Sequence, residues 1–447
     1  MNQSIEFLRA IDGVWKQPLP SSVMQKAEKS LLDYLAVTCA GAVFQKEKLE
    51  QYYVFAEPEK GRFKAIGTRK SMVLKEAVFL NGLNSHALDF DDGTNAGIIH
   101  LGSPIFSLLL PLAQRYGFGV RNVLKAAVIG YEASYTMAVS IQPEHKVLGY
   151  HATGTCGVIG ATIAASYMLD FTEEERFQAF AAACVSASGM LKVLDDGSEL
   201  KPYNVAKTAL LSLTSLQLSK SGFKGHPDPL GGYRGYFKMM TGKEDVELKP
   251  VLLHGTYAIM KTYTKPYASC RYTHPAVEAA IYLKKRYGWK VDEIEIIKVR
   301  TYNLAVSGHD HTEPRSSYSA KMSIPYATAV GYVYGRAGMR EFSEECLKNK
   351  TVLNLAKKVC VEEDDELSKA FPVLQPAVVE IQIKDGIGSE RVDFPKGEPE
   401  NPLTEAEFRD RYNGLMEYAG IDPALSKAVF DSVGCLSASM DDIVRGL

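Results

Sequence analysis

Three consecutive stretches between residues 103 and 170 carry apolar or small residues around the whole circumference of a helical pattern. Residues 103–117 and 121–141 are nearly apolar on every side, and residues 151–170 are rich in Ala and Gly, which lets helices pack closely. A helix without a polar face must be buried in a larger assembly. No apolar run approaches the roughly 20 residues that span a bilayer. The stretches therefore predict the centre of a large helical domain.

Helical spacing also continues on both sides of this centre. Residues 22–42, 75–90, 172–190 and 204–223 show it, and Thr172 with three acidic residues after it is typical of a helix start. The sequence therefore predicts a helical domain over residues 1–262.

The pattern changes after residue 262. Residues 292–302 are typical of a strand, and residues 376–394 of a β-hairpin, with a helix predicted over 274–289. We expect a small α+β domain over residues 263–399. Thr404 and Glu407 have capping-box spacing, so residues 400–447 should form a helical segment, which we expect to return to the first domain.

Global composition excludes several classes of protein. The net charge is -2 over 447 residues, which gives no reason to expect nucleic acid or an anionic membrane as a partner. Seven scattered cysteines without a CxxC pair fit reduced thiols, and the amino terminus lacks the pattern of a signal peptide, so we expect a cytoplasmic protein. We find neither a P-loop nor a dinucleotide-binding glycine pattern.

Residues 265–274 place two cations, a thiol and an imidazole within ten positions. An arginine can hold a carboxylate through two hydrogen bonds, a lysine acts as a point charge, and histidine titrates near neutral pH. This favours a site for an acidic small molecule. The alternative is a solvated loop in which His274 caps the following helix.

A second candidate is the carboxylate-rich segment with Asp89, Asp91 and Asp92, followed by His100 in a Gly-rich loop. Carboxylates at the end of a helix are unfavourable against its dipole. Asp89 could transfer or orient a proton, or the group could cap the next segment or bind Mg²⁺. The metal alternative is weak because no further ligand cluster has suitable spacing.

Single residues add to these candidates. His151 lies among small residues, and Lys201 precedes a proline at a helix start, where an anionic ligand would offset its unfavourable charge. Lys321, Ser323 and Tyr326 form a further group in which the phenol could donate a proton. Each has a structural alternative: a packed histidine, an exposed lysine, a buried tyrosine with one hydrogen bond. Together they suit proton abstraction next to a carboxylate, followed by loss of water or CO₂ or by reprotonation.

Seven stretches carry a resemblance to one enzyme family and follow its order along nearly the whole chain: residues 22–41, 84–92, 149–161, 200–209, 265–280, 320–329 and 396–408. The sequence resembles the MmgE/PrpD family, which includes 2-methylcitrate dehydratase, cis-aconitate decarboxylase and iminodisuccinate epimerase. The resemblance implies a mainly α fold: a large all-helical domain built from both termini, plus a smaller α+β lid domain. It also implies a homodimer, an active site between the domains, and no metal or other cofactor.

The same resemblance implies the site residues. Those expected to be catalytic are Asp89, His100, His151, Lys201, Lys265 and Tyr326. Those expected to bind the substrate are Thr94, Arg271, His274, Lys321 and Ser323. His151 and Asp89 are expected to transfer protons, the two catalytic lysines to hold carboxylates or a leaving hydroxyl, and the tyrosine to protonate or position.

Two departures from the family pattern fall in the expected substrate loop. Gly93 stands where many members have Thr, and the usual His-Pro-Ser is replaced by a longer stretch from His100 to Pro104. They weaken the expectation of 2-methylcitrate and, more strongly, of cis-aconitate. The resemblance favours a dehydratase acting on a small di- or tricarboxylic acid, with an epimerase of an amino- or hydroxy-dicarboxylate and then a decarboxylase as alternatives.

Overall fold

The computed structural model describes residues 2–447, apart from the side chains of residues 195–197. The chain divides into two compact units. Unit 1 holds the described residues up to Leu191, together with Lys201–Thr262 and Glu407–Leu447, and unit 2 holds Lys192–Leu200 and Tyr263–Ala406. The predicted boundaries follow residues 262 and 399, whereas the contacts divide the chain after residues 262 and 406 and assign a short inserted segment to unit 2.

Unit 1 is built almost entirely from helices, with one two-stranded antiparallel ribbon. Its elements are α1 (Gln3–Trp15), α2 (Ser21–Phe44), α3 (Lys46–Ala56), β1 (Lys60–Lys64), β2 (Ser71–Met72), α4 (Leu74–His86), α5 (Gly102–Tyr116), α6 (Val120–Ile141), α7 (Glu144–Val147), α8 (Ala152–Thr155), α9 (Gly157–Met168), α10 (Glu173–Ser186), α11 (Lys201–Lys220), α12 (Tyr236–Thr241), α19 (Glu405–Tyr418), α20 (Pro423–Gly434) and α21 (Met440–Arg445).

The centre of unit 1 is formed by α5, α6 and α9, as the apolar pattern predicts. Every residue of α9 is buried. A Cβ on Gly160 of α9 would lie 1.8 Å from Ser134 Oγ and 2.5 Å from the Gly130 carbonyl oxygen, both on α6. Only glycine permits this approach of the two helices.

Two predicted helices end earlier than their patterns suggest. The stretch 151–170 is divided into α8 and α9 at Cys156. The stretch 75–90 ends as a helix at His86, because Asp89 adopts left-handed backbone angles (φ 52°) and its N–H donates to the His86 carbonyl oxygen at 3.2 Å. The prediction that the helix continues to residue 90 is therefore wrong, and the carboxylates after His86 lie on a turn.

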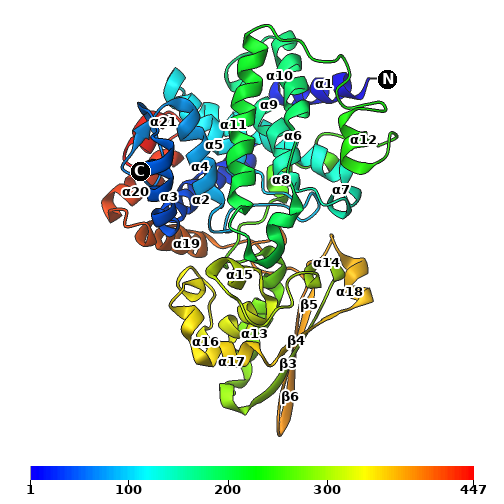
Figure 1. The fold of residues 1–447 in the computed structure, drawn as a ribbon, viewed down its shortest axis with the longest axis vertical. Coiled ribbons are helices and arrows are strands. Elements are labelled where there is room, and N and C mark those ends of the chain that lie inside the picture. The colour runs from blue at the N-terminus through cyan, green and yellow to red at the C-terminus, as the bar shows by residue number, and fades with distance from the viewer. Residues whose placement is uncertain (1) are drawn as a thin grey trace. The chain divides into compact units, whose positions relative to one another are not determined.

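The carboxyl-terminal helices pack on the amino-terminal part of unit 1. Helix α20 contacts α2, and α21 contacts α5 (Figure 1). The capping-box segment thus joins the helical unit, and α19 brings its residues to the turn that follows α4.

Unit 2 combines helices with one four-stranded sheet. Its elements are α13 (His274–Tyr287), β3 (Ile294–Thr301), α14 (Asn303–Val306), α15 (Ser317–Met322), α16 (Ile324–Tyr334), α17 (Lys350–Ala356), β4 (Val359–Glu363), α18 (Asp365–Ala370), β5 (Ala377–Ile383) and β6 (Gly386–Val392).

The sheet of unit 2 has the strand order β4-β3-β5-β6. β5 and β6 form the predicted antiparallel hairpin, and β3 pairs antiparallel with β5, Ile297 opposite Ile381. β4 was not predicted and pairs parallel with β3 at the edge. Buried residues alternate along β5, and α13 covers β5 and β6, as period-two patterning requires.

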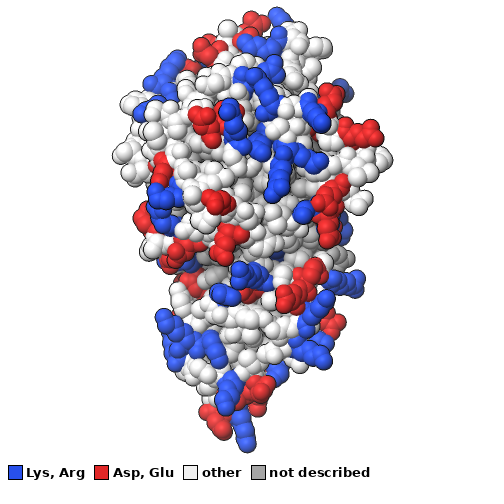
Figure 2. Space-filling view, turned by 90° about the vertical axis from the view of Figure 1, so that its left-hand side faces the viewer, with Lys and Arg blue, Asp and Glu red and all other residues white. Residues whose placement is uncertain are grey.

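Two further features of the molecule are the distribution of its surface charge and the hydropathy of its helices. Figure 2 shows basic and acidic side chains together on the face that it presents. Among residues 2–447, none of the helices has both the length and the hydropathy needed to cross a bilayer.

Candidate active site

Four predicted catalytic residues meet within unit 1. Asp89 lies on the turn after α4, and His100 in the loop before α5. His151 directly precedes α8, and Lys201 is the first residue of α11. Helices α4 and α11 pack along each other, which brings the end of one to the start of the other.

The pair Lys201–Asp89 is buried. The Lys201 Nζ atom lies 2.7 Å from Asp89 Oδ1, and the two side chains are 9% and 6% exposed. The sequence predicts an unfavourable ammonium at the start of a helix, and the carboxylate of Asp89 offsets that charge. The same Asp89 oxygen lies 3.8 Å from His100 Nε2, so Asp89 faces both the cation and the imidazole.

Asp91 joins two imidazoles. Its Oδ1 lies 2.9 Å from His86 Nδ1 and 3.4 Å from His100 Nδ1, and Ser103 donates to its Oδ2 at 2.7 Å. Burial raises the pKa of Asp91, but His100 and His86 outweigh burial and hold it well below its usual value. Asp91 is therefore ionised; it accepts a hydrogen bond from His86 and lies close to the ring of His100.

Asp92 anchors the loop to the start of α5. Its Oδ1 accepts a hydrogen bond from the Gly102 N–H at 3.0 Å, and its Oδ2 accepts one from the Tyr131 hydroxyl. A carboxylate at a helix amino terminus is favourable. Burial nevertheless raises the pKa of Asp92 to about 6, although these hydrogen bonds oppose the rise.

Hydrogen bonds give the imidazoles of His100 and His151 opposite tautomers. His100 Nδ1 donates to the Asp92 carbonyl oxygen at 2.8 Å, so its Nε2 carries the lone pair when the ring is neutral. His151 Nδ1 accepts from Asn204 Nδ2 at 3.1 Å, which leaves the ring proton on Nε2. His100 is thus arranged to accept a proton, and His151 to donate a hydrogen bond.

His86 is the third imidazole, and its side chain is fully buried. Because Nδ1 donates to Asp91, Nε2 carries a lone pair, for which no partner lies among the described residues. Burial lowers the pKa of His86 to about 4, and burial together with Lys201 lowers that of His151 well below its usual value. Both rings are neutral at neutral pH.

His86, Asp89, Asp91 and His100 each offer a ligand atom, and these atoms all lie within 4.8 Å of one another. The spacing in the sequence did not predict this group, because the 93–101 loop folds back on the turn. Two imidazoles and two carboxylates could hold a divalent transition-metal ion. The Lys201 ammonium, 2.7 Å from Asp89 Oδ1, would repel such an ion, and Asp91 already accepts from His86. The donor set therefore fits a hydrogen-bonded site better than a metal site.

The other predicted site residues lie in unit 2, apart from Thr94. Lys265 and Lys321 are buried, and the Cys270 N–H donates to the Lys321 carbonyl oxygen at 2.9 Å, which joins the 265–274 stretch to α15. Thr94 is buried in unit 1, where its backbone pairs with Ile99. Substrate binding by Thr94 and Lys321 and catalysis by Lys265 stay predictions.

Arg271 is held by other parts of unit 2. Its Nε donates to Glu398 Oε1 at 2.9 Å, Nη2 donates to the Pro395 carbonyl oxygen at 3.2 Å, and Nη1 donates to His274 Nδ1 at 2.7 Å. His274 Nε2 then donates to the Ser269 carbonyl oxygen at 3.2 Å. These contacts favour a structural role for both residues, and their binding of a substrate stays a prediction.

Ser323 and Tyr326 begin α16. Ser323 caps the helix by accepting from the Tyr326 N–H at 3.0 Å and donates to the His311 carbonyl oxygen at 2.5 Å. The Tyr326 hydroxyl is buried and donates to the Glu341 carbonyl oxygen at 3.2 Å. This is the structural alternative considered for a buried tyrosine, and burial raises the pKa of its phenol.

Sequence reasoning missed His86 and Asn204 as parts of the site, and named Asp91 only as a member of the carboxylate-rich segment. His86 and Asp91 belong to the motif that contains Asp89, and Asn204 follows Lys201 by three positions, one turn of α11. Helical spacing could have identified Asn204, whereas the pairing of His86 with Asp91 depends on the turn.

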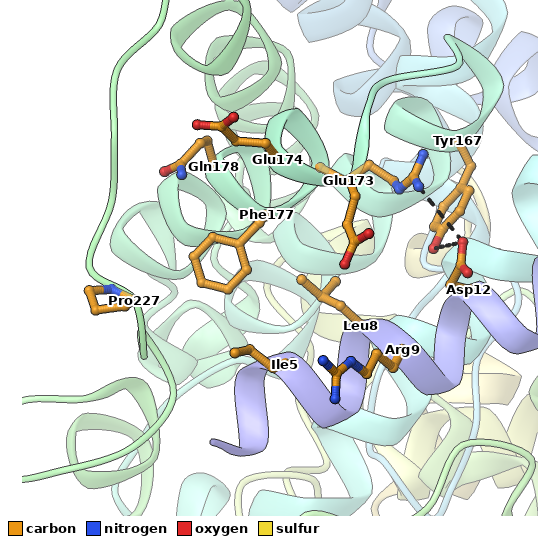
Figure 3. A pocket seen from close by; sticks show the side chains of 11 residues that line it. Ile5, Leu8, Arg9, Asp12, Tyr167, Glu173, Glu174, Phe177, Gln178 and Pro227 are labelled. Atoms are coloured by element: carbon orange, nitrogen blue, oxygen red, sulfur yellow. Dashed lines mark hydrogen bonds and ion pairs between the residues drawn. The ribbon is translucent and has the colours of Figure 1, made fainter. Parts of the chain in front are cut away.

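A pocket of about 770 Å³ lies elsewhere on unit 1, between α1 and α10 (Figure 3). Asp12 in this pocket lies 3.7 Å from Arg176 and 3.5 Å from the Tyr167 hydroxyl. None of the site residues lines it.

The chain is similar over most of its length to proteins of one known family. Residues 7–249 match the MmgE/PrpD N-terminal domain, and residues 267–431 match the MmgE/PrpD C-terminal domain. Cis-aconitate decarboxylase of Aspergillus terreus is 26% identical over 89% of this chain and 86% of that protein. The cis-aconitate decarboxylases of Mus musculus and Homo sapiens are 24% and 22% identical, each over 91% of this chain and over 85% and 86% of those proteins. The two domain matches cover most of the sequence in family order, and the chain therefore belongs to the MmgE/PrpD family.

Proposed function

We propose that this protein is a lyase for a small di- or tricarboxylic acid. It removes a proton from the carbon next to a carboxylate and then expels water, as 2-methylcitrate dehydratase does. The observation that carries the proposal is the buried combination of an oriented imidazole, His100, with the Lys201 ammonium and the Asp89 carboxylate. A base beside a cation suits a step in which a proton leaves and negative charge develops.

In this proposal His100 is the general base. Its Nε2 lone pair is fixed by the bond from Nδ1 to Asp92, and its side chain is 12% exposed, so a substrate can reach it. When Nε2 takes the proton, the ring becomes a cation, which the Asp91 carboxylate 3.4 Å from Nδ1 stabilises.

Lys201 and His151 provide the opposite function. The Lys201 ammonium attracts a substrate carboxylate and stabilises the enolate-like charge that forms on it. His151, with its proton on Nε2, can donate a hydrogen bond to that carboxylate or to the departing hydroxyl, which leaves as water with the proton that His100 has taken up. Asp89 keeps Lys201 in place in the absence of substrate.

Decarboxylation is the second candidate, and the relatives favour it, because they are named cis-aconitate decarboxylases. In that reaction the carboxylate leaves as CO₂, and the carbon takes up a proton in its place, from His100 in its protonated form. The same residues serve both reactions with the order of proton transfer reversed, so the products must decide between them.

Proton NMR in deuterated water tests the proposal with a panel of citrate, 2-methylcitrate, cis-aconitate, tartrate and aminosuccinate-type acids. We expect an olefinic product signal without release of CO₂ for at least one hydroxy acid. Release of CO₂ from cis-aconitate would instead support the decarboxylase. Loss of an α-proton signal without an alkene would indicate an epimerase, and no reaction of any kind across the panel would contradict the lyase proposal.

A further inference from the structure

Helix α19 from the carboxyl-terminal segment brings an arginine against the turn that carries the site carboxylates. We propose that Arg411 is a positioning residue, which fixes the peptide group of Phe90 and thereby sets the directions of Asp89 and Asp91. This inference rests on the proposed function for its effect on turnover, but its structural part can be tested in the protein without substrate.

The contacts of Arg411 are specific. Its side chain is 6% exposed, and its Nη2 donates to the Phe90 carbonyl oxygen at 2.6 Å and to Asp33 Oδ1 on α2 at 3.0 Å. The guanidinium carbon lies 4.0 Å from the centroid of the Phe90 ring. Arg411 therefore holds both the main chain and the side chain of Phe90, from 321 positions away in the sequence.

Phe90 lies between two carboxylates of the site, Asp89 and Asp91. Asp89 before it has left-handed backbone angles and points to Lys201, while Asp91 after it points to His86 and His100. A rotation of the Phe90–Asp91 peptide group would change the backbone angles of Phe90 and Asp91, and would move the Asp91 carboxylate relative to Asp89. Because a non-glycine residue with positive φ costs free energy, the conformation of Asp89 persists only where contacts on both sides determine it.

Stability alone is a poor reason for this arrangement. A buried ion pair such as Asp33–Arg411 contributes little net stability compared with apolar residues of the same size, since both charges lose their hydration. Its directional hydrogen bonds, in contrast, specify one conformation. Burial raises the pKa of Asp33 to about 6 despite the nearby Arg411, so the carboxylate is mostly ionised at neutral pH and the pair is present there.

The decisive variant is Arg411→Lys, which keeps a cation beside Asp33 but lacks the planar fork and is shorter. Arg409→Lys is the matched control, because Arg409 lies on the same helix, is exposed, and stacks on Phe430 at 4.1 Å, away from the turn. Both proteins are labelled with ¹⁵N-histidine, and their imidazole signals are compared with those of the wild type without substrate. Site substitutions such as His100→Asn assign the signals.

We expect Arg411→Lys to shift the signals of His86 and His100, which bond to Asp91 and to the Asp92 main chain, while Arg409→Lys leaves them unchanged. With the substrate that the panel identifies, kcat should fall by about tenfold to a hundredfold with KM nearly unchanged, since a displacement of about 1 Å has effects of that size. A lower melting temperature with unchanged imidazole signals and unchanged kcat would show that Arg411 only packs, and would overturn the inference.

Asp33→Asn is the second variant, for the case in which Arg411→Lys does not fold. The amide keeps an acceptor for Arg411 but removes the charge, so we expect smaller shifts of the same imidazole signals in the same direction. Unchanged signals in a folded Asp33→Asn protein would also count against the inference. The imidazole signals are measured without substrate. If no acid of the panel reacts, the proposed function is contradicted, but the result for Arg411 remains valid.

Discussion

At the scale of single residues, the three imidazoles of the site have different hydrogen-bond partners. His100 Nδ1 donates to a carbonyl oxygen, His151 Nδ1 accepts from an amide, and His86 Nδ1 donates to a carboxylate. These partners decide which Nε2 atom carries a lone pair and which carries a proton. Whether a ring can accept a proton or donate a hydrogen bond through Nε2 therefore depends on the residues that contact its Nδ1 atom.

His100→Asn should remove the general base while keeping a polar side chain of moderate size. We expect kcat to fall by about a hundredfold to ten-thousandfold, the usual effect of general-base catalysis. Steady-state kinetics on the substrate identified by NMR measure this change, and circular dichroism verifies the fold. If the kcat of a folded His100→Asn variant falls by less than a tenth of the wild-type value, another residue is the general base.

His86→Asn should change how stability depends on pH. The pKa of His86 is lowered to about 4 in the folded protein, so between pH 6.5 and 4 the unfolded chain binds a proton that the folded chain does not. The contribution of neutral His86 to the free energy of unfolding is therefore fully present above pH 6.5 and is lost as the pH falls towards 4.

Urea unfolding at pH 7.5 and pH 4.5 measures this difference. Between these two values, the wild type should lose about 2 to 3 kcal/mol relative to the variant. Comparing the two proteins cancels the opposite contributions of Asp33 and Asp92, whose raised pKa values favour the folded state on acidification. An equal change in both proteins would show that His86 is not held neutral.

Removal of divalent metals should leave turnover unchanged. Lys201 Nζ already pairs with Asp89 and would repel a cation bound by the four grouped side chains, and Asp91 already accepts from His86. Dialysis against EDTA, followed by the NMR assay, measures the effect. Lost activity that Mn²⁺ or Zn²⁺ restores would contradict a hydrogen-bonded site and support the metal alternative.

Much of the site in unit 1 was predictable at this scale, because its residues lie in short motifs. Asp89, His100, His151 and Lys201 were singled out by their chemistry and by the family resemblance, and the structure brings them together. The contact of Arg411 with Phe90 had no local signal, since it joins positions 321 residues apart. The tautomers were also beyond prediction, because they depend on Asn204 and on the Asp92 carbonyl oxygen.

At the scale of elements, the start of α5 holds the loop of the site. A Cβ on Gly102 would lie 2.5 Å from the Tyr131 hydroxyl and 3.0 Å from Asp92 Oδ1, the two groups that fix this end of the loop. Glycine is required here by space and not by backbone angles. The loop therefore depends on one small residue at a helix amino terminus.

Gly102→Ala should destabilise the protein by about 1 to 3 kcal/mol, the usual cost of overpacking, and should also reduce kcat by moving Asp92 away from His100. Gly13→Ala is the control: it lies inside α1 with nothing within 4 Å of its added Cβ, and should stabilise by up to about 1 kcal/mol. Thermal unfolding and kinetics compare the two. Unchanged stability and unchanged kcat in Gly102→Ala would show that the loop adjusts to the added methyl group.

Apolar periodicity predicted the helices and the hairpin but not where α4 ends or where β4 pairs. The helical pattern continues past His86, and only the backbone of Asp89 reverses the chain there. β4 has a mixed burial pattern and pairs in parallel with a strand some sixty positions earlier, so its assignment depends on tertiary contacts.

At the scale of the whole molecule, the mainly α fold with its α+β second unit and the membership of the MmgE/PrpD family confirm the predictions made from seven short motifs. The motifs identified a family because they occur in its order over nearly the whole chain, whereas each alone would be weak. The homodimer and the roles of the site residues in unit 2 stay predictions. They depend on how the two units and the two subunits are arranged, and short sequence motifs do not specify that arrangement.

The comparison of Lys201→Met with Lys220→Met tests the central claim most directly. Both lysines lie on α11, and each pairs with a carboxylate at 2.7 Å, but only Lys201 belongs to the site. We predict that kcat/KM on the identified substrate falls by at least about a hundredfold in Lys201→Met, the scale of a lost electrostatic contact to the transition state. Lys220→Met should stay within about twofold of the wild type, as surface substitutions do. Equal activity of the two folded variants would contradict the claim that this buried cluster carries out the reaction.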